Sequence, residues 1–186
     1  MSASLKKSII FLGLFLILLF SAGFLCAAEN QQPTEHEIKV AFIYNFAKFV
    51  KWPESPRNQS KKSIDLYIIG SGFPMDALEL INGKQVQGKT LIVKKTKSLS
   101  DIKDPEMIFI CQSERWRLGY IITMFKALPV LTIGDTEGFA EKGVIINLYT
   151  EENRIRFEIN IDAARQAGLI ISSQLLKLAR IIHASR

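Results

Sequence analysis

Apolar positions along the chain fall into runs that alternate between helical and strand-type spacing. Residues 36–52 have a helical pattern, in which apolar side chains recur every three or four positions until Pro53 ends the run. Strand-type and helix-type runs then alternate, at residues 64–70, 75–81, 90–93, 107–111, 114–128 and 129–133. Because these strands are apolar along almost their whole length and helices separate them, they predict a parallel sheet covered on both faces.

The last third of the chain has a different pattern. Residues 144–149 and 154–159 flank a polar turn, which predicts an antiparallel hairpin. A short helix is expected at residues 163–168 and a longer amphipathic helix at 172–183. The predicted fold class is α/β: a mostly parallel sheet with helices on both faces, a three-layer sandwich of the Rossmann or flavodoxin type. The C-terminal antiparallel hairpin is expected at its edge.

The second strand of this hairpin has one polar face. Arg154, Arg156 and Glu158 alternate with apolar side chains, so all three are expected on the same side of the strand. This side is a candidate surface for contact with a partner or with a second copy of the chain.

The first helix is apolar around nearly its whole circumference. Phe42 and Phe49 lie on one arc, which we expect to face the core, whereas Val40, Tyr44 and Ala47 lie opposite. Such a helix must be covered on both sides, either by another element of its own chain or by another chain, and the sequence leaves both possibilities open. Val40, Tyr44 and Ala47 are therefore candidates for a partner or dimer interface.

The N-terminus has the three parts of an export signal. Lys6 and Lys7 form a short basic segment, residues 9–20 are apolar apart from Gly13, and small residues follow at 21–23 and 26–28. This apolar run is shorter than the roughly 20 residues that a transmembrane helix needs. We therefore expect a cleaved signal, with an uncleaved anchor as the alternative.

Cleavage would divide the chain into a signal peptide at residues 1–28, a polar lead-in at 29–35 and a single α/β domain at 36–186. The length of 186 residues, with 48% hydrophobic side chains, suits one folded domain. Loss of Lys6 and Lys7 lowers the formal charge from +6 to +4. Outside the cytoplasm this charge favours solubility or acidic partners, and we expect neither nucleic-acid binding nor membrane insertion after cleavage.

The cysteines exclude an internal disulfide in the mature chain. Cys26 lies within the signal, so Cys111 remains alone. Cys111 ends a strand-type apolar run, which favours a buried, inert thiol over a reactive one.

Candidate chemistry is sparse. The sequence has neither a nucleophile elbow nor a phosphate-binding loop, and His36 and His183 lack the spacing of a metal site. We expect no catalytic residue, metal or cofactor. Gly70 and Ser71 follow a strand, and Asp135 follows another, at the strand ends where open α/β folds bind ligands. These three residues are candidate ligand contacts, with a tight turn and a helix cap as the alternatives.

Several motifs together resemble one family. They are KVAFIYNFAKFVKWP at 39–53, IIG at 68–70 with Pro74, LTIGD at 131–135, RFEIN at 156–160, and AGL with SSQLLKLA between 167 and 179. In order and spacing they are similar to those of the YfiR family of exported bacterial proteins, over essentially the whole mature chain.

The resemblance implies a periplasmic α/β domain that forms a homodimer. It also implies binding to the periplasmic part of an inner-membrane diguanylate cyclase, which represses cyclic-di-GMP synthesis and limits biofilm formation. The family's well-known representative carries redox-linked disulfides, which a chain left with Cys111 alone cannot form internally. The alternative function is a periplasmic small-ligand receptor with its site at the strand ends, and an enzyme has the least support.

Overall fold

The computed structural model describes residues 32–55 and 59–183, and its described part from Pro33 onward is one compact unit. Helices and 3-10 turns lie at α2 (Glu35–Phe49), α4 (Met75–Glu79), η2 (Leu99–Asp101), η3 (Gln112–Arg117), α5 (Leu118–Phe125), α6 (Ile161–Gln166) and α7 (Ser173–Leu176). Strands lie at β1 (Val50–Lys51), β2 (Ser63–Ile69), β3 (Gln85–Val86), β4 (Lys89–Thr96), β5 (Met107–Ile110), β6 (Leu131–Gly134), β7 (Ile146–Glu151), β8 (Arg154–Asn160), β9 (Ile170–Ile171) and β10 (Arg180–Ile182). The predicted signal peptide falls outside the described residues, among which no helix has the length and hydropathy needed to cross a membrane.

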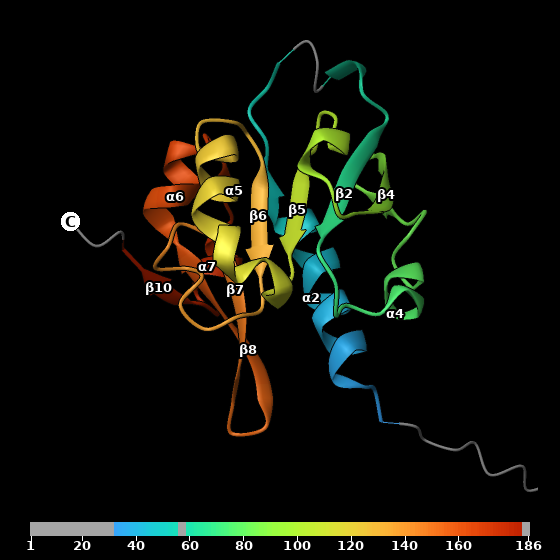
Figure 1. Cartoon of the computed structure of the whole chain (residues 1–186). Coiled ribbons are helices and arrows are strands. Elements are labelled where there is room, and N and C mark those ends of the chain that lie inside the picture. Colours follow the sequence, from blue (N-terminus) through green and yellow to red (C-terminus); the bar gives the residue numbers. More distant parts are fainter. Residues whose placement is uncertain (1–31, 56–58, 184–186) are drawn as a thin grey trace, which may run out of the picture. The chain divides into compact units, whose positions relative to one another are not determined.

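The main sheet has eight strands in the order β10-β8-β7-β6-β5-β2-β4-β3. Strands β4, β2, β5, β6 and β7 are mutually parallel, and β8 runs antiparallel to β7. The register aligns Ile68 of β2 with Phe109 of β5 and Phe109 with Ile133 of β6, so apolar side chains form a row across the parallel strands. The sequence prediction of a mostly parallel α/β sheet with an antiparallel hairpin is confirmed, and Figure 1 shows that hairpin extending beyond the other strands.

Two apolar clusters cover the two faces of the sheet. Leu66 and Ile68 of β2 belong to the first cluster with α2, α4 and α7, whereas Tyr67 and Ile69 belong to the second with α5. This division follows from the alternation of side chains along a strand. The fold is therefore three-layered, and α5 lies in front of the sheet in Figure 1.

The C-terminal segment differs from the prediction of a helix over 172–183. Ser172 caps α7, but this helix ends at Leu176, and the chain then forms β10 parallel to β8. Arg180 of β10 donates hydrogen bonds to Glu158 of β8. Its Ile181 and Ile182 are β-branched, and strand pairing with β8 outweighs the helical spacing of the leucines. The hairpin is consequently not the outermost element, because β10 lies beyond it.

The first helix begins as predicted but turns a different face to the core. Thr34 and Glu37 form a capping box at its N-terminus. Val40, Ile43 and Ala47 are completely buried, whereas Phe42 and Phe49 are only half-buried. The expectation that Phe42 and Phe49 mark the core side is therefore only partly right: both pack against the first apolar cluster, and Phe42 lies against the ring of Phe157, but they are at the margin of the buried side. A helix that is apolar all round gives no pattern from which the core side could be predicted.

Candidate functional site

The carboxyl ends of β2, β5 and β6 border a cavity of about 720 Å³. Ser71 and Asp135, which the sequence singled out separately, both line it. Gly70 lies directly before Ser71 with a φ of +99°, and the side chains of Ser113 and Glu114 occupy the space that a Cβ at Gly70 would need. Ser113 also accepts a hydrogen bond of 2.9 Å from the backbone N–H of Ser71. The structure thus brings the three candidates to one end of the sheet.

Asp135 is not free in this cavity. Its Oδ2 lies 2.9 Å from Nζ of Lys39, which reaches across from α2 and is also 2.8 Å from Glu35. Burial acts to lower the pKa of Lys39, but hydrogen bonds to Glu35 and Asp135 outweigh it and hold the pKa above its ordinary value. Sequence reasoning missed Lys39, because a lysine on a helix gives no sign of a partner so far along the chain.

The remaining lining combines an apolar floor with polar groups. Phe73, Phe109 and Cys111 supply the apolar part, and Arg115 and His36 also line the cavity. Cys111 is buried, as predicted, and burial, assisted by the charge of Asp135, raises the pKa of its thiol to about 11. The thiol is therefore protonated at neutral pH. Among the described residues there is no cluster of three or more acidic, histidine or cysteine side chains that could hold a metal ion.

The predicted interface on the first helix requires a correction. Val40 is 1% exposed and Ala47 is fully buried, so the chain's own core covers both side chains. Tyr44 is half-buried, and its hydroxyl donates a hydrogen bond of 3.0 Å to the carbonyl of Gln85. Of the two possibilities that the sequence left open for this face, the structure shows the first: an element of the same chain covers it.

The opposite side of α2 is the one left partly uncovered. Phe42 and Phe49 are half-buried there, and Ala41 is exposed. Two neighbouring elements add exposed aliphatic side chains: Ile170 in β9 is 64% exposed and Leu178 after α7 is 75% exposed. Strand β9 pairs with β1, which directly follows α2, and α7 contacts α2. We call these five residues the α2 outer surface.

The polar face of the hairpin is only partly available. Arg154 and Arg156 are exposed, and Arg156 pairs with Glu151 at 2.7 Å. Glu158 is buried, accepts a hydrogen bond of 3.0 Å from Asn147, and pairs with Arg180. The expectation of Glu158 as a surface contact is therefore wrong. Strand β8 was predicted to be the edge of the sheet, but β10 pairs with it, and Arg180 of β10 contacts Glu158.

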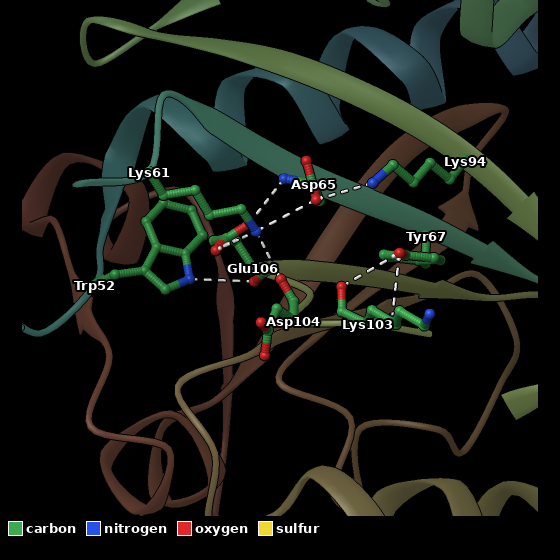
Figure 2. A network of polar contacts seen from close by, with 8 residues as sticks. All are labelled: Trp52, Lys61, Asp65, Tyr67, Lys94, Lys103, Asp104 and Glu106. Carbon is green, nitrogen blue, oxygen red and sulfur yellow. Dashed lines mark hydrogen bonds and ion pairs between the residues drawn. The ribbon is translucent and has the colours of Figure 1, made fainter. Parts of the chain in front are cut away.

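A second polar network lies at the other end of the parallel strands. Nζ of Lys61 lies 2.7 Å from Oε2 of Glu106 and 3.3 Å from Oδ2 of Asp65, and both carboxylates are buried (Figure 2). The indole N–H of Trp52 donates a hydrogen bond of 3.1 Å to the carbonyl of Glu106. Because Trp52 follows α2, this network fastens the end of the first helix to β2 and the start of β5.

The charges in this network favour ionised carboxylates. Burial acts to raise the pKa of Asp65, but hydrogen bonds from Lys94 and Ser63 and the charge of Lys61 outweigh it, so the pKa lies below its ordinary value. Lys94 is 3.0 Å from Asp65. Every charged group here has a partner, which is typical of a structural network rather than of a reactive site.

Comparison with known proteins identifies relatives at two levels. The model of a family described as YfiR/HmsC-like matches residues 36–180. None of the curated proteins matches the chain. Among solved structures, a conserved domain protein from Vibrio cholerae O1 biovar El Tor is similar, with 16% identity and a TM-score of 0.53. The match covers 80% of this chain but only 60% of the Vibrio cholerae protein, and at this identity it shows a shared fold alone.

Proposed function

We propose a function from the premise that this chain belongs to the YfiR/HmsC-like family. Family membership supports a periplasmic regulator of diguanylate cyclase signalling. The finer proposal is that the protein binds the periplasmic part of an inner-membrane diguanylate cyclase and represses it. Lower cyclic-di-GMP and less biofilm would follow while the complex persists. Export through a cleaved signal peptide is part of this proposal.

The observation that carries the proposal is the α2 outer surface. Large apolar side chains on the surface of a protein mark a site of association more often than they mark chemistry. Ile170 and Leu178 are mostly exposed, and Phe42 and Phe49 on the neighbouring helix α2 are only half-buried. Ala41, Phe42 and Phe49 of this surface lie within the motif at residues 39–53, which is one of the motifs that resemble the family. A homodimer is also proposed, with the family resemblance as its support.

A small-ligand receptor is the second candidate. Its support is the cavity in which Ser71 and Asp135 meet, with Lys39 and Arg115 beside them. The two functions are compatible, because Lys39 belongs to the same helix as the α2 outer surface. A ligand that competes for Asp135 would therefore act on the helix proposed to hold the cyclase.

The test is a measurement of cyclic-di-GMP in cells that express this protein together with a candidate inner-membrane diguanylate cyclase from the same organism. We expect the wild-type protein to lower cyclic-di-GMP, and Ile170→Asp or Leu178→Asp to restore it. Leu80→Asp is the matched control, because Leu80 is also exposed but lies on the segment after α4. Equal repression by all three variants would contradict the assignment of the surface, and no repression by the wild-type protein would contradict the function.

A further inference from the structure

The 3-10 helix η3 and the outward face of α5, which follows it directly, carry exposed large side chains: Trp116 lies in η3, and Tyr120 and Met124 lie in α5. Trp116 is 95% exposed, Tyr120 is 63% exposed and Met124 is 39% exposed, at intervals of four residues. The inward face of the same helix, including Ile121 and Phe125, packs into the second apolar cluster. Folding therefore fixes α5 by its inner face and leaves Trp116, Tyr120 and Met124, here called the aromatic row, in water.

Basic side chains lie on the same segment of the chain as the aromatic row. Arg115, Arg117 and Lys126 are all exposed on the same segment. Glu114 is the only carboxylate between residues 112 and 126, and it is buried and paired with Arg117. Within this segment, exposed aromatic rings therefore stand beside an excess of positive charge, whereas Glu141 and Asp162 of neighbouring elements line a cavity with Thr123 and Lys126.

The size and charge of this surface limit what it can bind. Two copies that met through it would bring like charges together. Helix α5 has eight residues and is about 12 Å long. Its outward face alone is therefore too small for a stable protein–protein interface, which buries about 800 Å² on each partner. Binding to a bilayer surface requires a smaller contact area, because tryptophan and tyrosine partition into the headgroup region and nearby cations contact anionic phosphates.

We propose that the aromatic row and its basic surroundings bind the surface of an anionic phospholipid bilayer. The chain would lie on the membrane without spanning it. The inner face of α5 packs into the second apolar cluster and α2 packs into the first, so the membrane and the α2 outer surface would be on opposite faces of the sheet. The inference goes beyond cyclase repression and does not depend on it, since lipid alone is the binding partner.

The test uses the purified exported protein and vesicles of phosphatidylethanolamine with phosphatidylglycerol, compared with pure phosphatidylcholine. We expect binding to the anionic vesicles, weakened by salt, with a blue shift of tryptophan fluorescence. Trp116→Ser should lower the partition coefficient roughly tenfold or more. Trp116→Phe should retain binding but lose the blue shift, because the other tryptophan, Trp52, is hydrogen-bonded within the fold.

Matched variants distinguish vesicle binding through the aromatic row from nonspecific adsorption of the protein to vesicles. Leu178→Ser removes an exposed apolar side chain elsewhere, and Arg154→Gln removes an exposed charge on the hairpin, so both should bind vesicles like the wild-type protein. Thermal melting should confirm that every variant is folded, since each altered side chain is exposed. The proposal is overturned if anionic vesicles bind no better than phosphatidylcholine, or if Trp116→Ser binds as well as Trp116→Phe. It is also overturned if adding a purified periplasmic cyclase domain, in the absence of lipid, shields the Trp116 side chain from water.

Discussion

Lys39 and Asp135 form an ion pair of 2.9 Å between groups that are 96 residues apart in the chain. Lys39 lies near the start of α2, and Asp135 follows β6 at the strand-end cavity. At the other end of the helix, the indole of Trp52 is bonded to Glu106. One end of α2 is thus held at the carboxyl ends of the parallel strands, and the segment after its other end is held near their amino ends. These contacts fix the position of the helix and leave its outer side free to contact a partner.

We predict that Lys39→Met destabilises the fold by about 2 kcal/mol, because Asp135, whose side chain is only 17% exposed, loses its charged partner in a poorly hydrated place. Urea unfolding, followed by circular dichroism, gives the free energy. Lys51→Met, which alters an exposed lysine just after the same helix, is the control and should be neutral. Equal stability of the two variants would show that the ion pair contributes little.

A second prediction concerns acid stability. The pKa of Asp65 is lower in the folded protein than in the unfolded chain, so the unfolded chain binds its proton first as the pH falls. The stabilisation is therefore complete above the unfolded value of about 3.9 and is lost as the pH falls through the lower folded pKa. Asp65→Asn should be less stable at neutral pH and should lose less stability on acidification. Unfolding free energies measured from neutral to acid pH check this, with the exposed Asp76→Asn as the control.

Local patterns in the sequence predicted the central strands but not the edge strand β10. The run at residues 107–111 is apolar throughout and the run at 64–70 is apolar apart from Asp65, a pattern typical of buried strands in a parallel sheet. The leucines after Ser172 fit a helix equally well, but in the structure residues 180–182 pair with β8 and Arg180 contacts Glu158. That contact depends on strands that meet only in the folded chain.

The candidate site was predictable only in part, for the same reason. Ser71 and Asp135 could be placed at strand ends, because α/β topology puts those ends together. Lys39 could not be placed, since no local pattern links a helical lysine to Asp135. Likewise, which side of α2 faces the core depends on how it packs on the sheet, and Val40 and Phe42 are equally apolar in the sequence.

The thiol of Cys111 should be unreactive in the folded protein. With a pKa of about 11 and a buried position, it is almost entirely protonated at neutral pH. A maleimide reagent should label it slowly in the native state and rapidly in denaturant. Cys111→Ala should cost on the order of 1 kcal/mol and leave repression intact. Rapid native labelling, or loss of repression by a folded Cys111→Ala protein, would instead support a redox role.

Two alanines on one helix test which side of α2 is buried. Ala47 is fully buried and Ala41 is exposed. Ala47→Glu places an unpaired charge in the core and should cost more than about 4 kcal/mol, enough to prevent soluble expression. Ala41→Glu should express and melt like the wild-type protein. Comparable melting temperatures for both variants would contradict the orientation of the helix.

The central claim, repression through the α2 outer surface, is tested most directly by calorimetric titration of the purified protein with the periplasmic part of the cyclase. The wild-type protein should bind, and Ala41→Glu, which keeps the fold, should bind at least about tenfold more weakly, a loss of about 1.4 kcal/mol. Leu80→Glu, on the exposed segment after α4 and outside every candidate interface, should bind like the wild-type protein. Wild-type affinity in Ala41→Glu, or no heat of binding from the wild-type protein, would contradict the claim.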